Sequence, residues 1–215
     1  MFANPILIII AFLFSLSIHE AAHAYMADRL GDPTARLAGR VTLNPLAHLD
    51  PLGTLLPFFL MFTGSPIIFG WGKPVPFDPY NLRRPRRDAA LISFAGPASN
   101  LILAAILTII VRLSYLFLGS TGFMVGLFLI PAIALNVMWA LFNLIPIHPL
   151  DGGKVLIGLL PHDLAYKWDE VLKQYGFIIL LFLIFPFFGV SPIIRILAPL
   201  INFILTVLLP NTPLV

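Results

Sequence analysis

The sequence predicts an all-α membrane protein with about five to six transmembrane helices and a short extended or re-entrant segment. Of its 215 residues, 59% are hydrophobic and only 11% are charged, and the mean hydropathy is +0.96. Soluble chains carry about 25% charged residues, so this chain has too little polar surface to cover itself in water. Its length suits one integral membrane domain over residues 1–215.

Charge and cysteine content narrow the possible functions. The formal net charge is only +3, so the basic residues are better explained as topology signals than as a nucleic-acid surface. The chain has no cysteine, which excludes disulfides, thiolate ligands and thiol nucleophiles. Any metal must therefore be held by nitrogen and oxygen, a set that suits zinc and leaves iron, cobalt and manganese open.

The first predicted helix covers residues 4–29. Asn4 and Pro5 favour its start, and the run Gly31-Asp32-Pro33 favours its end. No basic residue precedes the apolar run, so we expect a retained helix rather than a cleaved signal peptide.

Three ionisable residues, His19, Glu20 and His23, lie within this apolar helix in an HExxH pattern. Residues four apart lie on one helix face, so both imidazoles could reach one metal ion. Glu20 would then lie beside a metal-bound water as a general base. The alternative is a pair of buried histidines bonded to a glutamate, but ionisable groups in a bilayer are costly enough to indicate function.

The next two segments are predicted not to cross the membrane. Residues 34–50 alternate small polar and apolar side chains, which favours an extended or hairpin segment. The apolar run 54–69 contains two prolines and a glycine, which favours a re-entrant piece. Without a crossing here, the basic loops 27–50 and 71–90 share the cytoplasmic side.

Five full crossings are therefore expected, and the last two could instead form one bent hairpin. They cover residues 4–26, 90–117, 123–145, 175–189 and 191–209. With this topology, 11 of the 13 lysines and arginines lie on the cytoplasmic side.

Polar and small residues mark the two central crossings. Gly96 and Pro97 permit a kink and close helix approach, and Asn100 is polar at membrane depth. Asn100 could form an interhelical hydrogen bond or orient groups of the active site, and the sequence leaves both roles open. Gly122 and Gly126 have the spacing typical of helix packing.

The chain must unwind after the fourth crossing, because prolines and glycines interrupt residues 143–153. Asp151 then begins a new helical stretch near the expected depth of the two histidines, as the natural third metal ligand or a plain helix N-cap. From chemistry alone, His148 is a close competitor. His48 and His162 are expected to be surface or interfacial histidines.

Four separated blocks together resemble the site-2 protease family of intramembrane zinc metalloproteases. They are HEAAH at 19–23, GRVTLNP with His48 and DPLGT at 39–54, FAGPASN at 94–100, and NLIP with LDG at 143–152. The resemblance implies that His19, His23 and Asp151 bind one zinc ion and that Glu20 activates water. It also implies that Asn143 orients substrate or stabilises the oxyanion, and it favours Asp151 over His148.

The function implied by the resemblance is hydrolysis of peptide bonds within or near transmembrane segments of substrate proteins. The expected location is the cell membrane, with the active site toward the cytoplasmic side and no nucleic-acid partner. The chain would be a minimal form without the PDZ domain of many relatives. The sequence leaves open whether the chain forms a homo-oligomer.

A polytopic metal or proton transporter is the alternative, since it would also place histidine and carboxylate groups in the membrane. Transporters usually contain internal repeats, and this sequence has no such symmetry. An inactive binding relative is disfavoured because every proposed catalytic group is present.

Overall fold

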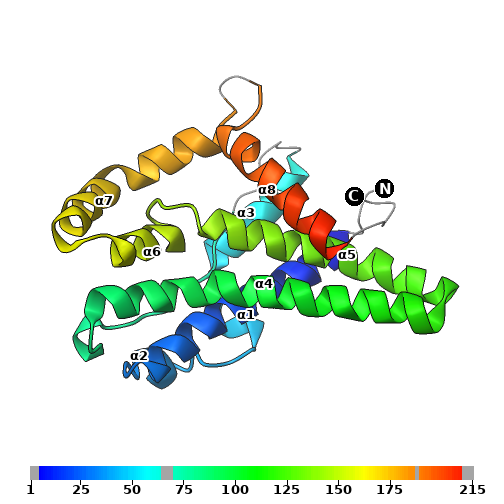
Figure 1. The fold of residues 1–215 in the computed structure, drawn as a ribbon, viewed down its shortest axis with the longest axis horizontal. Coiled ribbons are helices and arrows are strands. Elements are labelled where there is room, and N and C mark those ends of the chain that lie inside the picture. The colour runs from blue at the N-terminus through cyan, green and yellow to red at the C-terminus, as the bar shows by residue number, and fades with distance from the viewer. Residues whose placement is uncertain (1–4, 64–69, 187–188, 210–215) are drawn as a thin grey trace.

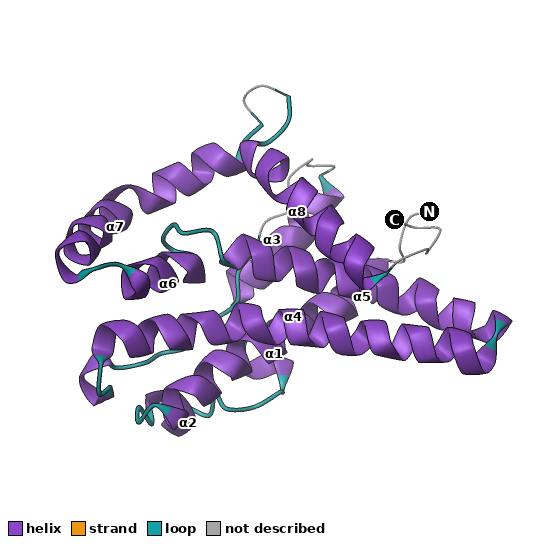
Figure 2. Ribbon diagram, in the orientation of Figure 1, coloured by secondary structure: helices purple, strands orange, loops and turns teal. Residues whose placement is uncertain are grey.

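The computed structural model describes residues 5–63, 70–186 and 189–209, and it confirms the all-α fold class (Figure 2). Helices make up the regular structure of this part of the chain. They are α1 (Pro5–Arg29), α2 (Thr34–Leu37), α3 (Pro51–Phe62), α4 (Pro85–Leu118), α5 (Ser120–Asn143), α6 (Asp151–Leu159), α7 (His162–Ile184) and α8 (Pro192–Leu208), with 3-10 turns at Pro45–Ala47 and Pro79–Asn81.

Helices α4 and α5 form a long antiparallel pair, and α1 packs against both of them (Figure 1). The chain reverses at Gly119, whose φ of 53° is a left-handed conformation that favours glycine. A Cβ atom added at Gly122 would overlap the Ser114 carbonyl, and one at Gly126 would overlap the Tyr115 hydroxyl. The predicted packing role of these two glycines is therefore confirmed.

The main hydrophobic core lies where α4 and α5 meet α7 and α8. Its buried members include Val111, Ile133, Val137 and Leu180. A smaller cluster joins the end of α1 to α4 through Ala27, Leu82 and Ile92, with Phe77 packed against it.

Three described helices, α1 (from Leu7), α4 and α5, are long and apolar enough to cross a membrane. With 34 residues at 1.5 Å each, α4 is about 51 Å long and exceeds the roughly 30 Å hydrocarbon core. Helix α8 is apolar but has only 17 residues, and the first half of α7 carries most of that helix's charges. The fourth and fifth crossings stay predictions.

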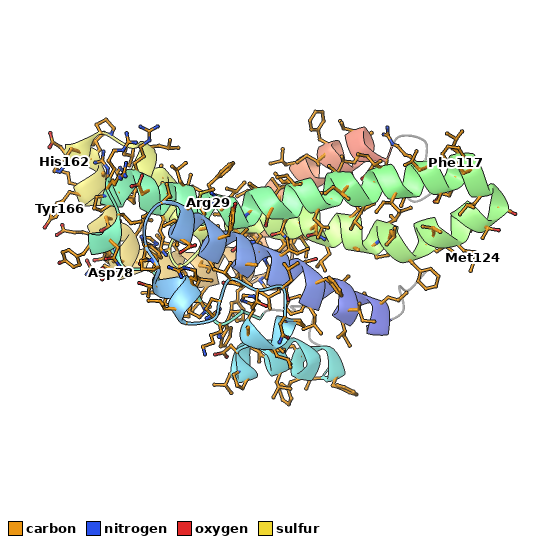
Figure 3. All side chains as sticks on the ribbon, turned by 90° about the horizontal axis from the view of Figure 1, so that it is seen from below. Arg29, Asp78, Phe117, Met124, His162 and Tyr166 are labelled. Atoms are coloured by element: carbon orange, nitrogen blue, oxygen red, sulfur yellow. The ribbon has the colours of Figure 1, made fainter. Side chains whose placement is uncertain are left out.

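Polar side chains are concentrated at one end of the molecule (Figure 3). Arg29, Asp78 and His162 lie at this end, whereas Phe117 and Met124 lie at the opposite tip of the α4–α5 pair. The long axis therefore runs from a charged end to an apolar tip.

Of the extended or hairpin segment predicted at residues 34–50, the hairpin is wrong and extended backbone is confirmed only in part. This segment contains helix α2 and a 3-10 turn, in which the Asn44 side chain accepts a hydrogen bond from the Leu46 N–H and Pro45 begins the turn. Extended pairing does occur, but Leu49 forms its antiparallel bridge with Gly72, which comes from a different loop. A local alternating pattern could not reveal a partner more than twenty residues away.

Helix α3 accounts for most of the apolar run after residue 50. Its 12 residues would extend about 18 Å, too short to cross a bilayer. Residues 64–69, the rest of the predicted re-entrant piece, lie outside the described part of the chain.

Asp32 joins the loop after α1 to the loop before α4. Its fully buried carboxylate accepts hydrogen bonds from the Thr34 N–H and hydroxyl, from the Asp78 N–H at 2.7 Å and from the Asn81 side-chain amide at 2.8 Å. Burial alone would raise the pKa of Asp32, but these hydrogen bonds outweigh it and lower the pKa.

We expect Asp32→Ala to lower the thermal unfolding temperature of the detergent-solubilised protein at neutral pH. Each buried donor left without a partner costs about 1–3 kcal/mol. Because the folded-state pKa lies below the unfolded value of about 3.9, the contribution of Asp32 is complete above that value and is lost as pH falls through the folded pKa. The difference between wild type and variant should therefore shrink below about pH 4.

Asp163→Ala is the matched control, because the Asp163 side chain is 98% exposed on α7. It should leave the unfolding temperature nearly unchanged. Equal unfolding temperatures for wild type and Asp32→Ala at neutral pH would contradict the proposed role of Asp32.

Candidate metal centre

Two histidines of α1 and the first residue of α6 meet in one compact cluster. His19 Nε2 lies 3.0 Å from His23 Nε2, and the Asp151 carboxylate oxygen Oδ2 lies 3.1 Å from the first and 3.2 Å from the second. His19 and His23 are 3% and 7% exposed, and the Asp151 side chain is 17% exposed. The structure thus brings together three side chains that were predicted as metal ligands.

The outer nitrogen of each imidazole is held by a hydrogen-bond acceptor. His23 Nδ1 donates to the Ile92 carbonyl at 2.7 Å, and His19 Nδ1 donates to the Asn100 side-chain oxygen at 2.6 Å. Because a carbonyl oxygen only accepts, each ring carries its proton on Nδ1 and directs the lone pair of Nε2 into the cluster. Both rings are therefore in the tautomer that binds a metal through Nε2.

Asn100 is oriented by two further acceptors. Its amide nitrogen donates to the Asn136 side-chain oxygen at 2.7 Å and to the Ser15 carbonyl at 3.2 Å, which leaves its oxygen facing His19. Asn136 is oriented in turn, because its own amide nitrogen donates to the Ala132 carbonyl. Asn100 therefore forms an interhelical hydrogen bond and also orients His19, the two roles that the sequence left open.

The donors of the cluster need a positive charge between them, which a metal ion or a proton on one imidazole Nε2 would supply. Two imidazole lone pairs and a carboxylate oxygen within about 3 Å of one another repel unless a positive charge lies between them. In a tetrahedral site with bonds of about 2.0–2.1 Å, the ligand atoms are about 3.3–3.4 Å apart. The observed separations of 3.0–3.2 Å are close to that edge length, so the donor set fits zinc.

Gly96 explains why α4 can approach the two histidines. A Cβ atom added at Gly96 would overlap the His23 ring and lie only 2.7 Å from His19 Cε1. The glycine therefore leaves room for the imidazoles between α1 and α4, while Asn100, one turn later, contacts His19.

Close turns and two glycines bring Asp151 to the cluster. The Leu150 N–H donates to the Ile147 carbonyl, and a Cβ atom at Gly152 would overlap the carbonyl oxygens of residues 144 and 145. The N-cap position of α6 belongs to Leu150, so Asp151 is not the helix cap that was considered as an alternative. Its carboxylate faces the histidines instead.

The other histidines lie outside the cluster. His148, the competing ligand, contacts the Asp169 carboxylate of α7 at 3.4 Å. The expectation that His48 is a surface or interfacial residue is wrong, because it is 0% exposed and its Nε2 donates to the Thr42 carbonyl. The His162 side chain is 89% exposed, as expected.

Glu20 is partly buried beside residues 71–74. We call this segment the strap. A Cβ atom added at Gly72 would lie 3.4 Å from the Glu20 carboxylate oxygen Oε1. The strap is held by the Leu49–Gly72 bridge and by the buried Arg40 guanidinium, which donates to the carbonyls of Lys73 and Pro74.

Asn143, predicted to contact substrate, is the last residue of α5. Its side-chain amide donates to the Trp139 carbonyl at 3.0 Å, and its role toward substrate stays a prediction.

Sequence reasoning missed Asn136 and the strap. Asn136 could have been found as a second asparagine within an apolar crossing, since polar groups at membrane depth indicate a function. The strap gave no such signal, because its position depends on pairing with a distant loop.

Comparison with curated proteins gives relatives that share most of this chain. It is 40% identical over 180 residues to the "Putative zinc metalloprotease YwhC" of Bacillus subtilis (strain 168), covering 82% of this chain and 78% of the relative. It is 33% identical over 189 residues to a "Putative zinc metalloprotease Rip2" of Mycolicibacterium smegmatis, covering 83% and 66%, respectively.

A protein of the same name from Mycobacterium tuberculosis (strain H37Rv) is 31% identical over 195 residues, which cover 86% of this chain and 71% of the relative. Comparison with protein-family models gives no match, and neither does comparison with solved structures.

We expect Asn100→Ala to weaken zinc binding about 10- to 100-fold, the usual cost of removing a hydrogen-bond partner of a metal-ligating histidine. Without Asn100, His19 can rotate or take the other tautomer. The measurement is a zinc titration of purified protein against a competing chelator.

Asn202→Ala is the control, because Asn202 is exposed on α8 and its carbonyl, which the substitution keeps, accepts the Thr206 hydroxyl. Its zinc affinity should equal that of the wild type. An unchanged zinc affinity in Asn100→Ala would contradict the role of Asn100 in orienting His19.

Proposed function

Since the chain belongs to the site-2 protease family of zinc metalloproteases, we propose that it hydrolyses peptide bonds within or near transmembrane segments of substrate proteins. One observation carries the proposal: His19, His23 and Asp151 form a cluster that could hold a metal ion, and two of them lie on a helix apolar enough to cross a membrane.

Zinc is the cofactor that the relatives' names and the donor set support. His19, His23 and Asp151 would hold it. When bound, zinc supplies a water activated for attack and a positive charge that polarises the substrate carbonyl.

Glu20 is the proposed general base. It lies between the two histidines of the HExxH pattern on α1, and its carboxylate would accept a proton from the attacking water. The water oxygen then bonds to the carbonyl carbon, and Glu20 returns the proton to the amide nitrogen as the carbon–nitrogen bond breaks. The products are a carboxylic acid and an amine, and the Glu20 carboxylate is regenerated.

Cleavage within a membrane segment requires the substrate backbone to leave its helix. Backbone carbonyls of an intact helix are hydrogen-bonded along the helix, so they are hidden from an attacking water. Irregular segments flank the proposed site, with the strap beside Glu20 and residues 144–150 before Asp151. We propose that such segments bind the substrate in an extended conformation through backbone hydrogen bonds.

We place the protein in the cell membrane with the active site toward the cytoplasm. The support is the concentration of basic residues in the loops beside the site, which the positive-inside bias assigns to the cytoplasmic face. The proposed partners are membrane-spanning proteins. A transporter is not favoured, because transport would need no general base between two metal ligands and the relatives are named as proteases.

We expect Glu20→Gln to keep one zinc ion per chain and to lose most peptidase activity. General-base catalysis typically contributes about 10²- to 10⁴-fold, and glutamine cannot accept the proton. Metal analysis of the purified protein and cleavage of a single-span substrate in proteoliposomes provide the two measurements.

Glu170→Gln, an equivalent change at an exposed position of α7, should leave both zinc content and activity unchanged. Full activity in Glu20→Gln would refute the general-base role. A zinc-loaded wild type that cleaves no membrane-spanning substrate would refute the proposed function itself.

We also expect helix-breaking residues in the substrate to speed cleavage. A glycine, asparagine or proline in the cytoplasmic third of the span lowers the cost of unwinding, by roughly 1–3 kcal/mol for glycine or proline. The measurement compares single-turnover cleavage of this substrate with that of an otherwise identical poly-leucine span. Equal rates, with unwinding or chemistry shown to be rate-limiting, would contradict the requirement for an extended substrate.

A further inference from the structure

Lys154 lies close to the proposed zinc site on helix α6. It comes three residues after Asp151, so the two side chains lie on the same side of the helix. Its ammonium lies 4.8 Å from the centre of the Phe77 ring, which attracts a cation through its π-electrons. Phe77 packs against the cluster that includes Ile92, and the Ile92 carbonyl holds His23.

The ammonium is within electrostatic reach of both carboxylates of the site. Burial of the amine lowers the pKa of Lys154, and the negative charges of Asp151 and Glu20 oppose that shift. Although the amine is partly removed from water, the residue as a whole is exposed. The cation therefore lies on the same side of α6 as Asp151 and is open to an incoming substrate.

The hydrogen-bond donors of Lys154 are uncommitted. Among the residues that the structure describes, the Lys154 ammonium has no ion pair within 4.0 Å and no hydrogen bond. It makes a cation–π contact with the Phe77 ring. A lysine ammonium has three N–H donors, and a carbonyl oxygen is a natural acceptor for them.

Arg40 is another cation whose charge acts on that of Glu20, but both of its terminal guanidinium nitrogens are engaged and its Nε, which has no partner among the described residues, is buried. Its buried guanidinium donates to the carbonyls of Lys73 and Pro74, which fixes the strap. Arg40 therefore has a structural role, whereas the exposed Lys154 has donors that no described residue occupies.

We propose that Lys154 is a catalytic residue that donates a hydrogen bond to the scissile carbonyl oxygen and stabilises the negative charge that develops there during hydrolysis. This inference rests on the proposed function. As water adds to the carbonyl carbon, the electron pair of the C=O bond moves to oxygen, and a nearby ammonium lowers the energy of that charge distribution. The proton stays on Lys154, and the charge is removed when the carbon–nitrogen bond breaks.

The test compares Lys154→Met with Lys154→Arg in the zinc-loaded enzyme. Methionine keeps much of the side-chain volume without the charge, so kcat should fall about 10²- to 10³-fold, as for loss of one oxyanion donor. KM, zinc content and unfolding temperature should stay close to wild type, and Lys154→Arg should retain part of the activity. Lys167→Met, which removes an exposed lysine of α7, is the matched control and should be fully active.

Inhibitor binding gives a readout other than activity. A phosphinic peptide carries an anionic oxygen where the carbonyl oxygen gains charge, whereas a peptide hydroxamate binds mainly through the metal. Lys154→Met should weaken the phosphinic peptide by about the same factor as kcat/KM, because a transition-state analogue senses the same interaction. The affinity for the hydroxamate should not change. Calorimetry measures both affinities.

Several results would overturn the role of Lys154 while leaving the proposed protease function intact. They are a wild-type kcat in Lys154→Met, an effect on KM alone, a loss of bound zinc, or equal weakening of both inhibitors. If Lys154→Met fails to fold, Lys154→Gln carries the same test. By contrast, a zinc-loaded wild type without peptidase activity would refute the protease function and, with it, this inference.

Discussion

The close approach of two imidazole nitrogens and one carboxylate oxygen is the constraint on which the surrounding structure depends. His19, His23 and Asp151 direct electron pairs toward a common point, with their atoms 3.0–3.2 Å apart. In an apolar interior such an arrangement is repulsive unless a metal ion or a proton lies between the donors, since the low dielectric screens the repulsion weakly. A metal ion would turn the repulsion into three bonds, and it would then also hold α6 against α1. The chain around the cluster serves to keep these donors in place.

A buried line of asparagines transmits this constraint across three helices. His19 of α1 donates to Asn100 of α4, and Asn100 donates to Asn136 of α5. Asn100 and Asn136 are 0% and 1% exposed, so a missing partner would leave a desolvated polar group. Each side-chain amide in this line has its hydrogen-bond partners. The line therefore fixes one register of α1, α4 and α5 and one tautomer of His19. Gly96 permits the close packing that this register requires.

Much of the fold could be predicted from the sequence, because hydropathy and helix periodicity are local properties. The first helix, the α4–α5 pair and the new helix at Asp151 occur as predicted. The predictions that failed concern residues whose partners are remote in sequence. Residues 34–50 do not form a hairpin, since Leu49 pairs with Gly72, and His48 is buried rather than at the surface because it lies within that packed loop region.

The features of the candidate site also divide into those that local sequence predicts and those that depend on tertiary packing. The sequence by itself determined that two histidines four residues apart share a helix face with a glutamate beside them, because the period of 3.6 residues requires it. It also determined the membrane class and the choice of nitrogen and oxygen ligands. Only the tertiary structure decided that Asp151 meets His19 while His148 turns to Asp169, and that Asn100 and Asn136 orient the ring. These contacts join helices separated by dozens of residues, so they depend on how the helices pack and not on any local pattern.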